Sequence, residues 1–149
     1  MPSYPPPFTE PKLNEIDSAL AELDPTFEEF ARVHGFTFLR GTSGCFNVPR
    51  RWLRRRTLNL SQGIDLVIAL PMLERLERGF FPAIPCTVYI RAQNHDTNRW
   101  RHTNIVEARP FDELSHSLAQ CLADAGATLD AYTPDFVTQH GDPVFPPKP

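Results

Sequence analysis

Two segments in which apolar and polar residues alternate constrain the fold of this chain more than any other feature. In residues 86–93 the apolar set is Cys86, Val88, Ile90 and Ala92, and the polar set is Thr87, Tyr89, Arg91 and Gln93. A period of two is typical of a strand with one buried face. Residues 94–98 (NHDTN) favour a turn, so residues 100–108 are predicted to return as the partner strand. We expect its inner face to carry Trp100, Val106 and Ala108, and its outer face to carry Arg101, Thr103 and Glu107.

Helical periodicity appears before and after the strand-like region. Leu13, Ile16, Leu20 and Leu23 form one apolar stripe, which predicts a helix over residues 11–23. A second helix is expected to begin at Asp24-Pro25 and to end before Gly35. Apolar spacing and turn residues predict the remaining elements: a strand at 36–39, a hairpin of 57–60 and 64–70 with Asn59 and Asp65 facing out, a short helix at 71–78 and a last helix at 112–126.

These elements favour one fold class. A sheet that is apolar on one face only requires helices on that face alone. The sequence predicts a single α+β domain over residues 11–133. Its mainly antiparallel sheet of about five strands carries the N-terminal and C-terminal helices on one face. Ten of the sixteen prolines lie in residues 2–11 or 134–149, so residues 1–10 and 134–149 are expected to be Pro-rich tails.

Cysteine usage and hydropathy bear on the compartment. Cys45, Cys86 and Cys121 lie 41 and 35 residues apart, which favours neither a disulfide framework nor a zinc site. No apolar run has the roughly 20 residues that a membrane helix needs. A secretory signal would require a cation near its start, and no cation precedes Lys12. We therefore expect a cytoplasmic protein of the bacterial type, with no membrane contact and no cofactor.

A cluster of arginines dominates the middle of the chain. Five guanidinium groups lie within seven residues, together with one indole ring; the residues are Arg50, Arg51, Trp52, Arg54, Arg55 and Arg56. Guanidinium forks bind phosphates and carboxylates, and Trp52 could stack on a base, so one hypothesis is anion or nucleic-acid binding. Against it, the whole chain carries a net charge of −3, whereas nucleic-acid-binding domains are commonly basic. We expect the chain's own carboxylates to neutralise the cluster.

A second hypothesis concerns catalysis. His95, Asp96 and His102 lie in or beside the predicted turn, and these residue types can ligate a metal or transfer protons. Asn, Asp and Thr are also what a turn requires for its backbone alone. Ser43 and Cys45 lie in a glycine-containing loop without a nucleophile motif. We therefore assign no catalytic or metal-ligating residue and favour a protein that is not an enzyme, with an enzyme that uses His95, Asp96 and His102 as the second alternative.

The preferred hypothesis rests on how charge is distributed. Residues 1–35 sum to −5, residues 36–60 to +6, residues 61–111 to +1 and residues 112–149 to −5. Acidic segments can dock a basic partner, because complementary charge selects partners and speeds association. We expect a protein-binding module of the inhibitor, immunity or adaptor type. It would use its acidic helices or its exposed sheet face, through Glu15, Glu22, Glu28, Glu29, Tyr89, Arg91 and Arg101.

Overall fold

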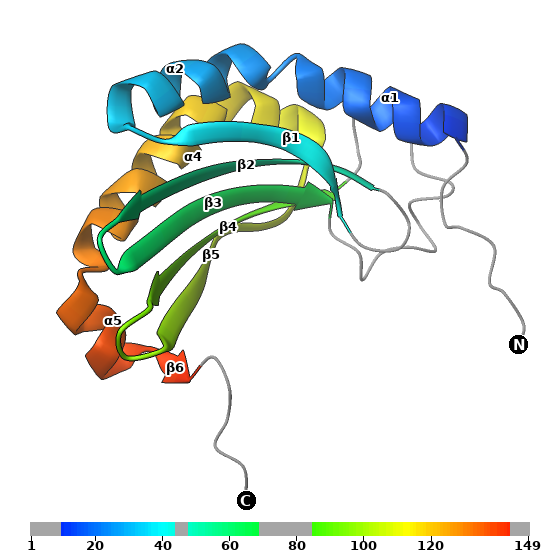
Figure 1. Ribbon diagram of the computed structural model, residues 1–149. Coiled ribbons are helices and arrows are strands. Elements are labelled where there is room, and N and C mark those ends of the chain that lie inside the picture. The colour runs from blue at the N-terminus through cyan, green and yellow to red at the C-terminus, as the bar shows by residue number, and fades with distance from the viewer. Residues whose placement is uncertain (1–9, 44–47, 69–84, 144–149) are drawn as a thin grey trace, which may run out of the picture.

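The computed structural model describes residues 10–43, 48–68 and 85–143 of the 149-residue chain. The helices are α1 (Glu10–Ala21), α2 (Asp24–His34), α4 (Phe111–Ala131) and α5 (Pro134–His140). The strands are β1 (Thr37–Ser43), β2 (Val48–Thr57), β3 (Leu60–Ile68), β4 (Pro85–Asn94), β5 (Arg99–Pro110) and β6 (Asp142–Pro143). Figure 1 shows the helices from both ends of the chain against the sheet, which confirms the predicted α+β architecture.

The six strands form one sheet in chain order, β1-β2-β3-β4-β5-β6, and every neighbouring pair is antiparallel. Because consecutive strands are neighbours, the short connections among the described residues are hairpins. The predicted helix at 71–78 and the loop containing Cys45 lie outside the described residues. None of the described helices combines the length and apolarity that crossing a membrane requires.

The core lies between the helices and one face of the sheet. Ile16 and Leu20 of α1 and Phe27 of α2 are fully buried, as the predicted stripes require. They pack with fully buried strand residues such as Leu53 and Ile64. Helix α2 ends as predicted, because Gly35 adopts a left-handed conformation (φ 74°) and its N–H bonds to the Ala31 carbonyl.

The folded region extends past residue 133, where the sequence analysis placed the start of a Pro-rich tail. Thr133 caps α5, since its side chain accepts a hydrogen bond from the Phe136 N–H at 3.2 Å. Pro134 occupies the first turn, where a missing N–H does no harm. Val137 is fully buried. This short helix packs on β4 and β5, and β6 then pairs with the start of β5.

The two faces of β5 are the reverse of the prediction at its first residues. Trp100 pairs with Gln93 and therefore shares the polar face of β4. Arg101 and Thr103 instead lie on the helix side, where both contact the Tyr132 hydroxyl. Register shifts near Val88 and a positive φ of 47° at Ala108 interrupt the alternation. The inward phase of Val106 therefore does not extend to Trp100, and Ala108, which was predicted to face inward, is exposed.

Candidate functional site

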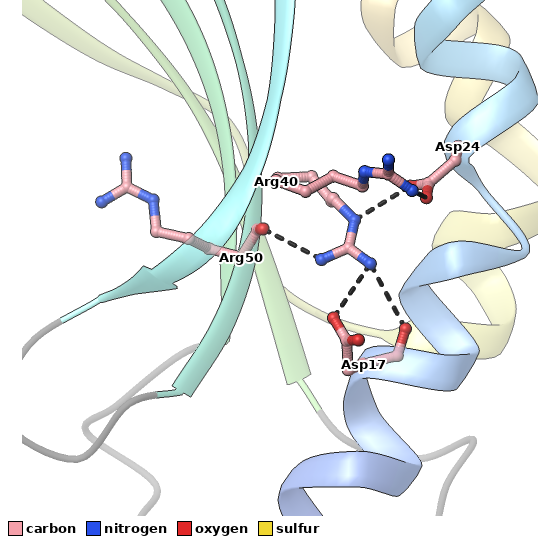
Figure 2. Close-up of polar contacts among 5 residues, drawn as sticks. Asp17, Asp24, Arg40 and Arg50 are labelled. Atoms are coloured by element: carbon pink, nitrogen blue, oxygen red, sulfur yellow. Dashed lines mark hydrogen bonds and ion pairs between the residues drawn. The ribbon is translucent and has the colours of Figure 1, made fainter.

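The arginine cluster lies on β2, and its side chains alternate between the two faces of the sheet. Arg51 pairs with Leu66 and faces the helices, as does Leu53. Arg50 and Arg54 face the other side, next to strand neighbours that are polar or glycine. Figure 2 shows the Arg50 side chain directed away from Asp17 and Asp24. A cluster of cations that is compact in the sequence is therefore divided between two surfaces.

On the helix side, Arg51 is a buried structural residue with 2% exposure. Its Nε donates to Asp24 Oδ1 at 2.9 Å, and its Nη2 lies 3.0 Å from Asp17 Oδ1 (Figure 2). Arg40 donates to the other Asp24 oxygen at 3.2 Å. These ion pairs join β1 and β2 to α1 and α2.

Arg55 also faces the helices and is held by three kinds of contact. Its Nε donates to Gln62 Oε1 at 2.6 Å, and its Nη2 donates to Asp130 Oδ1 at 3.0 Å. Its guanidinium lies 4.5 Å from the centre of the Phe36 ring. Arg51 and Arg55 thus serve the fold, and neither presents an unpaired cation to a ligand.

On the opposite side of the sheet, Asp65 is the centre of a second set of polar contacts, although it was expected to face out. Its carboxylate is fully buried. It accepts hydrogen bonds from Arg50 Nη2 at 2.7 Å, from the Tyr89 hydroxyl at 2.7 Å and from both terminal nitrogens of Arg54. Burial, and then the bond to Asp65, raise the pKa of Tyr89. We call these four residues the Asp65 cluster.

Two glycines make room for the side chains that cross this face. A Cβ on Gly63 would collide with the guanidinium of Arg54, its partner across β2 and β3. A Cβ on Gly41 would lie 2.7 Å from Cη2 of Trp52. The Arg50 guanidinium in turn lies 4.5 Å from the centre of the Trp52 ring. The arginines and Trp52 therefore lie flat along the sheet.

A pocket of about 510 Å³ adjoins the Asp65 cluster on the same face. It is lined by Arg54, Ser61, Gln62, Gly63, Arg91, Ala92, Gln93 and Trp100. Arg91 is exposed and forms no hydrogen bond or ion pair with any described residue. We use "polar face" for the Asp65 cluster, Trp52, the pocket and His102, whose ring lies 4.7 Å from that of Tyr89.

The charges of the polar face are unbalanced. The pocket lining contains two arginines, Arg54 and Arg91, and no acid. Adding Arg50 and Asp65 from the cluster gives three cations and one anion, a formal charge of +2. The first 35 residues, which include α1 and α2, sum to −5. The protein is therefore basic on part of its sheet and acidic on its first two helices.

The other predicted partner-binding residues are divided between these surfaces. Glu15, Glu22, Glu28 and Glu29 are exposed on or beside the first two helices. Glu15 pairs with Lys12 at 3.3 Å and Glu29 with Arg32 at 2.6 Å. Tyr89 and Arg91 lie on the polar face. Arg101 does not join them, because its Nη1 donates to the His140 carbonyl at 3.0 Å on the other side of β5.

The residues considered for catalysis have separate partners. His95 Nε2 lies 2.6 Å from Ser61 Oγ, and Asp96 accepts a hydrogen bond from Asn59 at 2.6 Å. The His102 ring instead contacts the Tyr89 ring in a tilted arrangement, with an interplanar angle of 40°. Within the described ranges, no group of three or more His, Cys, Asp or Glu side chains is arranged to hold a metal ion.

Sequence reasoning missed Asp65, Gly63 and Trp100, which build the polar face. One signal was available: Asp65 is the acid nearest to the arginines on the next predicted strand. Its pairing depends on the register of β2 with β3, which places Arg54 opposite Gly63.

Comparison with known proteins adds nothing to this geometry, since no family model, no curated protein and no solved structure matches the chain.

Proposed function

We propose that this chain is a non-enzymatic protein-binding module that receives its partner on the polar face of the sheet. The observation that carries the proposal is the pocket beside the Asp65 cluster, in which Arg91 is exposed and has no partner among the described residues. Arg, Trp and Tyr are the residue types that contribute most to protein interfaces. Arg54, Trp100 and Tyr89 supply all three types here.

Preorganisation supports this choice of surface over the acidic helices. Arg54 and Tyr89 are held in place by a buried carboxylate, so less side-chain entropy is lost when a partner binds. Glu15 and Glu29 lie on exposed helix surface, where their ion pairs with neighbours three residues away are weak. If a partner docked on these helices, their exposed side chains would become ordered on binding, and the entropy lost would weaken the complex.

The division of the arginine cluster weighs against a polynucleotide as the ligand. Arg51 and Arg55 are bonded to the chain's own acids on the helix side. Arg50 and Arg54 share the single carboxylate of Asp65. A nucleic acid would therefore meet fewer available arginines than the sequence of the cluster suggests. Nucleic-acid binding is one of the outcomes of the test below.

Site-specific photocrosslinking in the source cells tests the proposal. A photoreactive residue at Gln93, which lines the pocket, is expected to crosslink a protein. The matched probe at Glu28, exposed on α2, is expected to give none. The crosslink should disappear when Arg91→Glu is added. A crosslink from position 28 alone would favour the acidic helices, a crosslink to nucleic acid would favour the alternative, and the absence of any crosslink would refute the proposal.

We further propose that this module acts in the bacterial cytoplasm as an inhibitor, immunity protein or adaptor. The three widely spaced cysteines support a reducing compartment. Cys86 and Cys121 are buried in the core, where they pack as small apolar residues. Fractionation of the source cells should recover the chain with cytoplasmic markers, and recovery in an extracellular or membrane fraction would contradict this assignment.

A further inference from the structure

Resting on the proposed function, we infer that the pocket on the polar face binds a carboxylate in an acidic segment of the partner protein. Arg91 and Arg54 would donate hydrogen bonds to this carboxylate, while Trp100 packs against the neighbouring part of the segment. The inference thus names both the chemistry of the partner and the residues that recognise it.

Arg91 offers the donors that a carboxylate requires. Its side chain is exposed at the pocket and makes no hydrogen bond or ion pair within residues 10–43, 48–68 and 85–143. The planar guanidinium presents parallel N–H groups that match the two oxygens of a carboxylate. Forming that pair does not require Arg91 to break an existing contact with a described residue.

Arg54 contributes a second cation whose position is already fixed. Its Nη1 donates to the Leu53 carbonyl and to Asp65, and its Nη2 donates to Asp65 at 3.2 Å. These bonds leave Nε–H and one Nη2 N–H without an acceptor among the described residues. Asp65 also serves Arg50, so one carboxylate faces two guanidinium groups. The cluster keeps a formal charge of +1 and still attracts an anion.

The size of the pocket and the charge of the whole chain favour a short acidic peptide over a long polyanion. A volume of about 510 Å³ suits one or two side chains. A short segment within the pocket lies closest to Arg54 and Arg91, whereas an extended polyanion would also approach the acids of a chain whose net charge is −3. Trp100 adds an indole surface to the pocket and gives the binding event a spectroscopic signal.

A titration of the full chain followed by NMR tests this inference through the Trp100 indole N–H and the Arg91 Nε–H signals. The probe is acetylated and amidated pentaglutamate, with pentaglutamine of the same form as its control. We expect saturable shifts with pentaglutamate and at least about tenfold weaker binding of pentaglutamine. Arg91→Gln should weaken pentaglutamate binding about tenfold, whereas Arg32→Gln, which removes the same charge from α2, should leave it unchanged.

Three outcomes would overturn the inference: equal binding of both peptides, an equal effect of Arg32→Gln, or tighter binding of inorganic phosphate or oligothymidylate at the same ionic strength. The crosslinking experiment separates this inference from the proposed function. A protein crosslinked from position 93 together with no pentaglutamate binding would refute only the carboxylate. Pentaglutamate binding without any protein crosslinked from that position would refute the protein-binding function and leave the anion site.

Discussion

Replacing Asp65 with Asn is the most direct test of the architecture of the polar face. The substitution keeps the size of the side chain and removes its charge. The wild-type carboxylate is fully buried and accepts bonds from Arg50, Arg54 and Tyr89. An amide carries one carbonyl oxygen, which accepts at most two hydrogen bonds, and its NH2 group would face donors. Two partly buried guanidinium groups would also lose their counter-ion.

The size of the expected effect follows from these contacts. A hydrogen bond to a charged group contributes roughly 1.5–3 kcal/mol, and at least two of the bonds to Asp65 are lost. Removing one partner of a buried ion pair lowers stability by about 3–5 kcal/mol. Both estimates give a loss of about 4 kcal/mol in the free energy of unfolding. Such a loss is a large part of the roughly 5–15 kcal/mol that holds a domain together.

Urea unfolding at neutral pH, followed by tryptophan fluorescence, measures this loss. With a slope of about 2 kcal/mol per M urea, the midpoint should fall by about 2 M. The matched control is Asp130→Asn, which removes an acid whose side chain is 71% exposed in its pair with Arg55. This control should lose less than about 1 kcal/mol. A loss below about 1 kcal/mol for Asp65→Asn, or equal losses for both variants, would refute the reasoning.

Three further substitutions test neighbouring contacts. Gly63→Ala should displace the Arg54 guanidinium, lower stability by about 1–3 kcal/mol and weaken pentaglutamate binding; unchanged binding would contradict this packing. Arg51→Met should lower the free energy of unfolding in urea by about 3 kcal/mol, because buried Asp24 then keeps Arg40 as its one remaining ion-pair partner among the described residues; an unchanged stability would contradict the ion-pair geometry. Burial raises the pKa of the Cys86 thiol to about 12 in the folded chain, whereas a thiol in the unfolded chain has a pKa of about 8.5. The burial of the neutral thiol therefore contributes fully to stability below about pH 8.5, and this contribution falls as pH rises toward 12. Between pH 8 and pH 10 the wild type should lose about 2 kcal/mol more than Cys86→Ala, and parallel pH profiles would contradict the burial of this thiol.

The elements that sequence reasoning predicted correctly are those whose signal is local. The stripe containing Ile16 and Leu20 identified the first helix, and the alternation around Ile90 identified β4. Proline was misread after residue 133, because its density predicted a tail while Thr133 and Pro134 form the start of a helix. The missing information was tertiary, since α5 is held by the burial of Val137 against the sheet.

The polar face was harder to predict because it depends on register. Asp65 looked like an ordinary outward residue of a strand, and its burial follows from two arginines of β2 and one tyrosine of β4. Which residues meet across strands is set by pairing, and a single bulge reverses the faces. That reversal exchanged Trp100 with Arg101. Residue types that could form a site were therefore visible in the sequence, whereas their assembly was not.

The distribution of charge in space changes what the net charge of this protein implies. A value of −3 argues against anion binding only if the chain presents one average surface. Strand alternation instead sends Arg51 to Asp17 of α1 and Arg55 to Asp130 of α4, and it sends Arg50 and Arg54 to the polar face. The helices thus neutralise only the arginines that face them, and the polar face stays basic. At an ionic strength near 0.15 M, screening over about 8 Å separates the two surfaces, so an acidic segment bound at Arg91 responds to the polar face more than to the net charge.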